Sequence, residues 1–322
     1  MPEKMWAAHL KGRRRFEMVQ VDIPRITDDQ VLAKISKVAI CGSDRGIWDG
    51  HHFMNEVYAW EDFEPGDHGH EACGNAVKVG KNVRHVEEGD QIVRLNLYAS
   101  MDLKMACFAE YAVCDAPIEC NGGDPEVMCF ADPVTVALNH VHHADVHPGD
   151  TVLVLGQGLL GLLCAQLLID NHVNVLVTDL DTDRLAIAER FGAVGFDAAA
   201  ADYETRIQDS AKRIDAIIEC SGADEAVDAS CRLLSVGGTL VIMGATRTRL
   251  TLDYTQLRVR GARVVFPMNR VNAKDNWEPA ARILQRGKIE VKSLISHRDK
   301  LANLQQVLEN YNEKWIRVVL TP

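Results

Sequence analysis

The chain has 322 residues, of which 47% are hydrophobic and 25% charged, a composition typical of globular proteins. Its 35 Lys and Arg against 46 Asp and Glu give a net charge of −11, which argues against binding to nucleic acid or to an anionic membrane. No apolar run approaches the roughly 18 residues of a membrane span, and the N-terminus lacks the apolar core of a signal peptide. Nine cysteines without a C-x-x-C pair indicate reduced thiols and a cytoplasmic location.

The first 130 residues contain short apolar runs that are broken by Gly, Pro and Asp. Runs such as VLAKISKVAI (31–40) and FAEYAVC (108–114) predict a largely antiparallel β domain. The basic stretch KGRRRF (11–16) is expected to be the exposed tip of a hairpin. A helix is predicted next, over VTVALNHVHHADV (134–146).

From residue 151 onward, strands and helices alternate. Strands are predicted over 151–155, 173–179, 214–222 and 237–245, and helices over 159–171, 182–193 and 223–236. The strands are continuous apolar runs, which favours a parallel sheet with helices on both faces. A further apolar run (261–266), two helices (276–287 and 300–312) and a final strand (316–322) complete the chain.

The segment TVLVLGQGLLG (151–161) is typical of a dinucleotide-binding turn. Gly156, Gly158 and Gly161 form G-x-G-x-x-G between a predicted strand and a predicted helix, where a pyrophosphate meets free N–H groups. Asp179 ends the next strand, where its carboxylate can bind ribose hydroxyls and repel a 2′-phosphate, so NAD is favoured over NADP. The alternative is a glycine turn without a nucleotide. Further candidate cofactor residues lie in this turn, the next helix and a later strand end: Leu159, Leu160, Arg184 and Cys220.

The segment PGDHGHEACG (65–74) suggests a metal site. Cys41 follows an apolar strand, His70 lies in this segment, and Asp132 begins the helix into the second half. A thiolate, an imidazole and a carboxylate suit Zn²⁺ with one coordination position left open, as in catalytic sites. Spacing alone leaves open that these residues are merely packed or solvated.

Several motifs occur in order along nearly the whole chain: CGSD, GHEACGNAVKVGKNV, GDQIV, FAEYAVC, GDTVLVLGQGLLG, IECSG and GGTLVIMGA. This series resembles the zinc-dependent medium-chain dehydrogenases, especially the sorbitol (polyol) and threonine dehydrogenase branches. The resemblance implies an α/β fold: a GroES-like β-rich catalytic domain (1–133), a doubly wound parallel-sheet Rossmann domain (134–267), and a C-terminal segment (268–322) that returns to the catalytic domain. It also implies a homo-oligomer, a dimer or tetramer.

The resemblance also assigns roles to individual residues. It implies that Cys41 and His70 are zinc ligands, that Asp132 stands where polyol dehydrogenases usually have Glu, and that Glu71 lies beside the metal or exchanges with its bound water. Ser43 would pass on the substrate proton, and Asp44 would orient His70. Arg317 would reach the cofactor pyrophosphate. His68 is not needed by the family pattern, so we expect it to be a neighbour in the cleft between the domains or a solvated residue.

The sequence departs from the family at three points. The region 94–114 is short, and Cys107, Cys114, Cys120 and Cys129 lack the compact spacing of a structural zinc lobe, so we expect one catalytic zinc and no structural zinc. Position 46 is Gly, where many relatives have a relay histidine, so the proton would leave through Ser43 and water, or through His51 or His52. At position 132, Asp replaces Glu.

These observations predict an NAD- and zinc-dependent dehydrogenase acting on a secondary hydroxyl. The loop 45–64 mixes aromatic and polar side chains, which suits a sugar, polyol or cyclitol if they line the site; alternatively the aromatic residues pack inward. Two other hypotheses remain: a metal-free reductase of the same superfamily, and an NAD-binding protein without catalytic activity.

Overall fold

The computed structural model describes residues 2–51, 54–57, 59–95, 106–244, 250–267 and 276–322, and the chain forms two compact units. The β-rich unit comprises Met1–Asp132 and Trp277–Pro322, and the Rossmann unit comprises Pro133–Asn276. The sequence placed the second boundary at 267. It falls at 276 because helix α10 (Trp277–Gln285) packs on α3 and β7 of the β-rich unit.

The β-rich unit is built on a seven-stranded sheet. Its strand order is β14-β15-β3-β4-β5-β7, and β6 pairs with β3. The strands are β3 (Val31–Ala39), β4 (Glu71–Val79), β5 (Gln91–Val93), β6 (Tyr111–Cys114), β7 (Ile118–Glu119), β14 (Ile295–Lys300) and β15 (Arg317–Thr321). The core between the strands and the hairpin includes Phe63, Phe108 and Leu32, all almost fully buried.

A separate hairpin, β1 (Lys4–Gly12) and β2 (Arg15–Asp22), covers part of this core. Its turn contains the basic run, and the side chains of Arg13, Arg14 and Arg15 are exposed. The expected hairpin tip is therefore confirmed.

The helices of the β-rich unit are short. They are α1 (Gly42–Asp49), α2 (Met54–Val57), α3 (Pro125–Met128), α10 (Trp277–Gln285) and α11 (Leu304–Glu309), with 3₁₀ turns at Trp60–Asp62, Lys292–Leu294 and Leu301–Asn303. Helix α4 (Ala131–Ala144) begins three residues before the predicted start, so Asp132 lies in its first turn. In the described residues, none of these helices or those of the Rossmann unit has the length and apolar character needed to cross a membrane.

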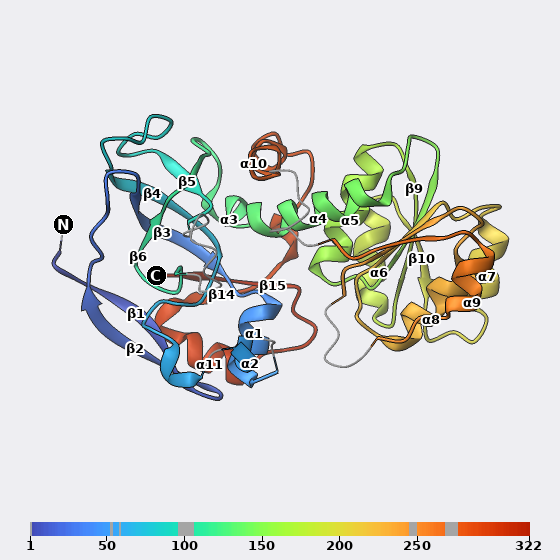
Figure 1. Cartoon of the computed structure of the whole chain (residues 1–322), viewed down its shortest axis with the longest axis horizontal. Coiled ribbons are helices and arrows are strands. Elements are labelled where there is room, and N and C mark those ends of the chain that lie inside the picture. The colour runs from blue at the N-terminus through green and yellow to red at the C-terminus, as the bar shows by residue number, and fades with distance from the viewer. Residues whose placement is uncertain (1, 52–53, 58, 96–105, 245–249, 268–275) are drawn as a thin grey trace. The chain divides into compact units, whose positions relative to one another are not determined.

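The Rossmann unit contains a six-stranded parallel sheet with the order β10-β9-β8-β11-β12-β13. The strands are β8 (Thr151–Leu155), β9 (Asn174–Asp179), β10 (Val194–Asp197), β11 (Ala216–Glu219), β12 (Thr239–Ile242) and β13 (Arg263–Val265). Helices α5 (Leu159–Asp170) and α6 (Thr182–Arg190) pack together, and α7 (Tyr203–Ser210), α8 (Asp224–Leu233) and α9 (Tyr254–Val259) form a second group (Figure 1). The strand order reverses between β8 and β11, so the doubly wound fold is confirmed.

Candidate metal centre and dinucleotide turn

The register of the seven-stranded sheet brings distant residues together around Cys41. Ala39 pairs with Glu71 on β4 and with Val319 on β15, and both pairings are antiparallel. Cys41 lies two residues beyond Ala39, at the point where the chain enters α1. Arg317 lies two residues before Val319, so the start of β15 reaches the same end of the sheet as Cys41.

Three of the predicted metal ligands converge at this end. One ligand atom each from Cys41, His70 and Glu71 lie within 4.8 Å of one another. Asp132, in the first turn of α4, places its Oδ2 atom 3.8 Å from the Nε2 atom of His70. The structure therefore brings together the four residues that the sequence singled out as a metal set.

Asp44 ties two of these ligand segments together. This carboxylate is buried; its Oδ2 accepts a hydrogen bond from the backbone N of Cys41 at 2.9 Å, and its Oδ1 accepts one from the backbone N of Gly69 at 3.1 Å. The same Oδ1 lies 3.9 Å from Nδ1 of His70. Gly69 has a φ of +78°, and a Cβ atom there would lie 2.4 Å from the Phe108 ring, so the turn before His70 requires glycine.

The electrostatics of the site suit a cation. Burial alone would lower the pKa of His70, but Cys41, Asp44 and Asp132 outweigh it and raise this pKa well above its ordinary value. The carboxylate of Glu71 is buried beside these groups, and its charge is partly compensated by Arg317. A soft thiolate, an imidazole and carboxylates surrounded by excess negative charge form a donor set that fits Zn²⁺.

Arg317 lies under this site rather than at the surface. Its side chain is buried, its Nη1 atom is 2.8 Å from Oε2 of Glu71, and the same Nη1 donates to the carbonyl of Ile40 at 2.6 Å. Burial favours the neutral guanidine, but Glu71 and Cys41 outweigh it, and the pKa of Arg317 is raised. The sequence did not predict this ion pair, and the pyrophosphate role of Arg317 stays a prediction.

The other predicted residues near the metal site differ in how deeply they are buried. His68 is buried, with ring centroids 5.3 Å from Phe16 and 4.8 Å from Phe63, so the second of its two expected placements, as a solvated residue, is wrong. Ser43 is half-buried in the first turn of α1. In the loop 45–64, Trp48 and Phe63 are buried in the core, which favours the inward-packed alternative for these two side chains.

His51 is the described candidate to replace the relay histidine. His51 lies beyond the end of α1, with Nε2 3.6 Å from Asp49 Oδ2 and 3.4 Å from Arg13 Nη2. Ser43 lies near the start of α1, and a rise of about 1.5 Å per residue places the last residue of the helix, Asp49, about 9 Å from it along the axis. His52 lies outside the described residues.

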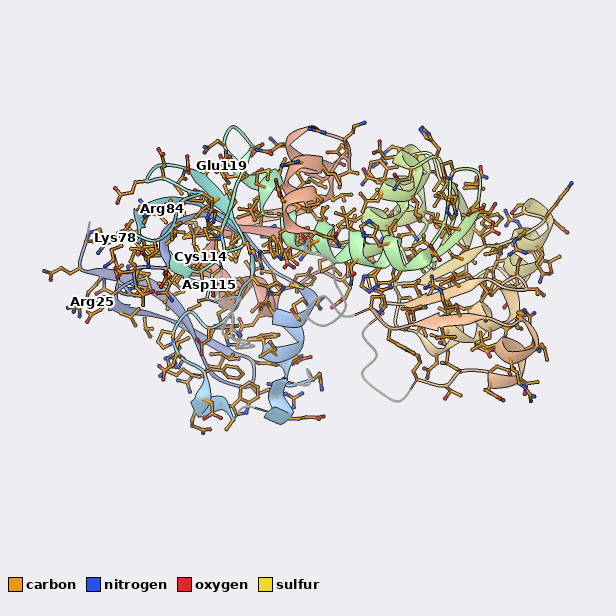
Figure 2. The ribbon with its side chains drawn as sticks, turned by 45° about the horizontal axis from the view of Figure 1, so that its top comes forward. Arg25, Lys78, Arg84, Cys114, Asp115 and Glu119 are labelled. Carbon is orange, nitrogen blue, oxygen red and sulfur yellow. The ribbon has the colours of Figure 1, made fainter. Side chains whose placement is uncertain are left out.

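The cysteines considered for a structural zinc are packed in the core. Cys107, Cys114, Cys120 and Cys129 are all buried. Burial and the adjacent Asp115 raise the pKa of Cys114 to about 12, and its thiol donates to the carbonyl of Val31. Figure 2 shows Cys114 and Asp115 side by side within the β-rich unit.

The glycines of the fingerprint adopt the geometry that a dinucleotide turn needs. Gly156 has a φ of +88°, and a Cβ on Gly161 would lie 1.9 Å from the carbonyl oxygen of Gly156. Gly158 precedes α5, and no described residue lies within 4 Å of a Cβ placed there. The backbone beside Gly158, at the N-terminus of this 12-residue helix, therefore has room for a pyrophosphate.

Asp179, the acidic residue of the fingerprint, forms a hydrogen bond to the glycine turn from the end of the next strand. Oδ2 of Asp179 accepts from the backbone N of Gln157 at 2.5 Å, and Oδ1 accepts from that of Asp181 at 2.8 Å. Other candidate cofactor residues follow the same edge: Leu159 is buried, while Leu160, Arg184 and Cys220 are half-buried.

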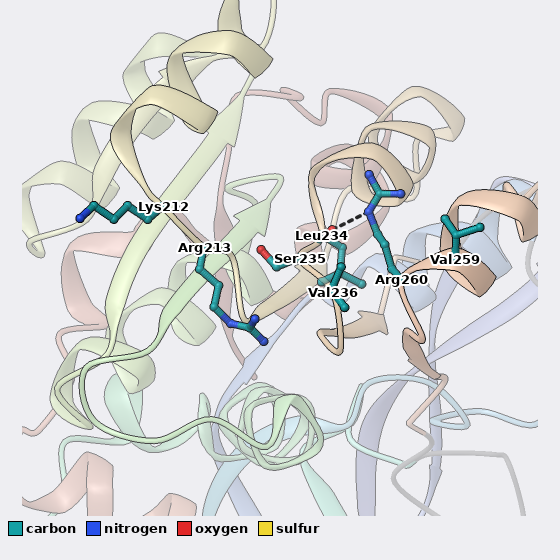
Figure 3. Close-up of a pocket in the computed structure, with 7 residues that line it drawn as sticks. All are labelled: Lys212, Arg213, Leu234, Ser235, Val236, Val259 and Arg260. Carbon is teal, nitrogen blue, oxygen red and sulfur yellow. Dashed lines mark hydrogen bonds between the residues drawn. The ribbon is translucent and has the colours of Figure 1, made fainter.

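A pocket of about 590 Å³ lies at the opposite, amino-terminal edge of this sheet (Figure 3). Lys212, Arg213, Leu234, Ser235, Val236, Val259 and Arg260 line it. The guanidinium of Arg260 donates to the carbonyl of Leu234 at 2.7 Å, and Arg213 pairs with Asp215. None of the predicted site residues lines this pocket.

Comparisons with known proteins agree with this geometry. A family model described as "Alcohol dehydrogenase GroES-like domain" matches residues 27–144, and one described as "Zinc-binding dehydrogenase" matches residues 160–286. The chain is 25% identical over 331 residues to L-galactonate-5-dehydrogenase of Escherichia coli (strain K12), with 94% of each protein covered. It is 26% identical over 336 residues to L-threonine 3-dehydrogenase of Pyrococcus furiosus, with 93% of each covered.

A solved zinc-binding dehydrogenase from Sinorhizobium meliloti 1021, bound to NADP, matches with a TM-score of 0.89 and 26% identity over 100% of both chains. The two family models follow one another along most of the sequence, in the same order as the β-rich and Rossmann units. The chain therefore belongs to the zinc-dependent medium-chain dehydrogenase/reductase superfamily, a superfamily of oxidoreductases.

Proposed function

We propose that this chain oxidises a secondary hydroxyl of a polar substrate, with NAD as the hydride acceptor and a single zinc ion. The observation that carries the proposal is the convergence of Cys41, His70 and Glu71 within 4.8 Å in a chain of this superfamily. The buried cysteines outside this group support one zinc per chain. Nine free thiols also support a reducing compartment such as the cytoplasm.

Cys41, His70 and Asp132 would hold the ion in this proposal. We assign Asp132 as the third ligand because Arg317 already compensates the charge of Glu71 at 2.8 Å. When bound, zinc acts as a Lewis acid toward a substrate oxygen, and NAD accepts the hydride.

Side chains of the protein position the ligands and move the substrate proton. Asp44 keeps the Cys41 and His70 segments in register through its two backbone hydrogen bonds. Ser43, beside Asp44 in the first turn of α1, would accept the proton from the substrate hydroxyl and pass it toward solvent.

We infer a preference for NAD from the charge around Asp179. Its carboxylate is fixed at the end of β9 by two backbone N–H groups, and Asp181 and Asp183 follow it closely. A 2′-phosphate would meet this negative charge. Since the Sinorhizobium meliloti structure holds NADP, the ratio of kcat/KM for the two cofactors is the necessary measurement.

The substrate class rests on the named relatives. L-Galactonate-5-dehydrogenase and L-threonine 3-dehydrogenase take their names from polar, hydroxyl-bearing compounds. We propose a substrate of this kind, such as a polyol, sugar, sugar acid or cyclitol. We also propose a homo-oligomer, because β13 is an edge strand and Phe266 beside it is 56% exposed.

The test combines metal analysis with a substrate screen. We expect one zinc per purified chain and NADH formation with at least one polyol, sugar acid or amino alcohol. Cys41→Ala should remove zinc and turnover but keep NADH binding, whereas Cys114→Ala, a buried thiol in the same unit, should keep all three. Zinc well below one per chain, with turnover unaffected by chelators, would instead support the metal-free reductase. NADH binding without turnover on any alcohol would support a non-catalytic protein.

A further inference from the structure

Glu219, the last residue of β11, is a fully buried carboxylate in the Rossmann unit. Its Oε1 atom accepts three hydrogen bonds from the loop that follows the strand: from the backbone N and the hydroxyl of Ser221, and from the backbone N of Gly222 at 3.0 Å. Its Oε2 atom receives none from the described residues. A buried charge is costly unless it is paired or hydrogen-bonded, so this arrangement calls for a reason beyond packing.

The loop that Glu219 holds is in contact with the first glycine of the dinucleotide turn. A Cβ on Gly156 would lie 2.8 Å from Cβ and 2.9 Å from both Cα and N of Ser221. The backbone N of Cys220 also donates to the carbonyl of Leu155, directly before that turn, at 2.8 Å. The position of the glycine turn after β8 is therefore set partly by the loop after β11.

The next strand is attached to the same residue. The carbonyl of Glu219 accepts from the backbone N of Met243 at 2.8 Å and of Gly244 at 2.9 Å. A Cβ on Gly244 would lie 2.2 Å from N of Gly222 and 2.5 Å from Oε2 of Glu219. Glu219 thus joins β11 to the end of β12 through its main chain, and it joins β11 to the end of β8 indirectly, through the loop that its side chain holds.

These strand ends flank the point at which the strand order reverses. In open α/β sheets, ligands bind at the carboxyl edge of the strands at this reversal. We propose that Glu219 is a positioning residue for the dinucleotide: its carboxylate fixes the loop 220–223 against Gly156 and so sets the shape of the pyrophosphate-binding turn. This inference rests on the proposed use of a nicotinamide dinucleotide.

Asp215 offers a matched control on the same strand. It lies directly before β11, and its Oδ2 accepts from the backbone N of Thr151 at 2.9 Å, at the start of β8. Asp215 therefore links the same two strands as Glu219, but at the amino-terminal edge, away from the glycine turn. If Glu219 only stabilised the sheet, substitutions of Glu219 and of Asp215 would have the same effects on Tm and on NADH binding.

The experiment measures the Kd for NADH by fluorescence titration, together with Tm and zinc content, for the full chain and for Glu219→Ala, Glu219→Gln and Asp215→Ala. Glu219→Ala should weaken NADH binding by about tenfold or more, comparable to the loss when a hydrogen-bond partner of a metal ligand is removed. Glu219→Gln keeps an acceptor oxygen for the loop and should recover part of the affinity. Asp215→Ala should lower Tm while leaving the Kd within about twofold, and zinc should be unchanged throughout.

The inference is overturned if both Glu219 variants bind NADH within about twofold of the unmodified chain, or if Asp215→Ala weakens binding as much as Glu219→Ala does. If Glu219→Ala fails to fold, the comparison of Glu219→Gln with Asp215→Ala decides in the same way. Failure of the unmodified chain to bind either NADH or NADPH would overturn the proposed function as well. That result is distinguishable because it does not depend on any variant.

Discussion

Replacing Arg317 by Met tests whether this arginine supports the metal site or binds the cofactor. The substitution keeps much of the side-chain volume but removes the partner of Glu71 and the donor to the Ile40 carbonyl. Both residues of the ion pair are almost fully buried, with exposed side-chain fractions of 6% and 2%. Loss of one partner of such a pair costs roughly 3–5 kcal/mol, because the other charge stays buried without compensation.

For a unit of this size, each kcal/mol lowers Tm by about 2–4 °C, so Arg317→Met should lower it by roughly 6–20 °C. The assay is thermal and urea unfolding of the apoprotein, with NADH titration of the folded protein. Glu71→Gln/Arg317→Met should be more stable than Arg317→Met alone, because the orphaned charge is gone. Arg45→Met is the control: that arginine, 30% exposed, pairs with Glu313, and its loss should cost about 1 kcal/mol or less. A drop in stability no larger than that of the control, combined with weaker NADH binding, would refute the structural role and support the pyrophosphate contact.

Three further predictions follow from single contacts. Asp44→Ala should weaken zinc binding by about 10- to 100-fold in a chelator competition, because the Cys41 and His70 segments lose their shared hydrogen-bond acceptor. Unchanged zinc affinity would show that Asp44 is not needed to position these ligands. Gly161→Ala should abolish NADH binding or folding of the Rossmann unit, since its Cβ would meet the Gly156 carbonyl at 1.9 Å; normal circular dichroism and affinity would contradict this. The hydrogen bond from Arg298 lowers the pKa of Glu126 despite burial. The stabilisation by the ionised Glu126 should therefore be present near pH 7 and be lost as the pH falls below about 5 and through the lowered pKa. In urea unfolding, the free energy of unfolding of Glu126→Gln, which lacks this charge, should converge with that of the unmodified chain at low pH.

The Rossmann unit was largely predictable because its signals are local. Strand β8 was predicted at its observed bounds, and the glycine fingerprint placed the following helix correctly. Strand β10 and helix α7 were not identified. Residues 194–197 (VGFD) form a four-residue strand with an exposed Val194, and 203–210 (YETRIQDS) bury only Ile207, so neither segment carries a strong apolar pattern.

Helix α1 shows that local composition can fail to indicate a helix. GSDRGIWD (42–49) contains two glycines and two aspartates, a composition typical of turns. The helix forms because Asp44 accepts from the backbone N of Cys41 at its start, and because Ile47 and Trp48 are buried in the core. The Asp44 contact is local, but the burial of Ile47 and Trp48 is tertiary and depends on the rest of the fold. Helix propensity therefore gave little signal here.

The ion pair between Glu71 and Arg317 at the metal centre could not be predicted from sequence patterns, for a different reason. Alternation along a strand has a period of two, and it cannot indicate which strand lies beside it or in which register. The Glu71–Arg317 pair exists because β3 pairs with β4 through Ala39–Glu71 and with β15 through Ala39–Val319. A shift of either register by one residue would turn one of the two side chains to the other face of the sheet and leave the other charge buried alone. The strand register that brings the ligands together therefore also pairs Glu71 with Arg317, and this ion pair in turn favours that register.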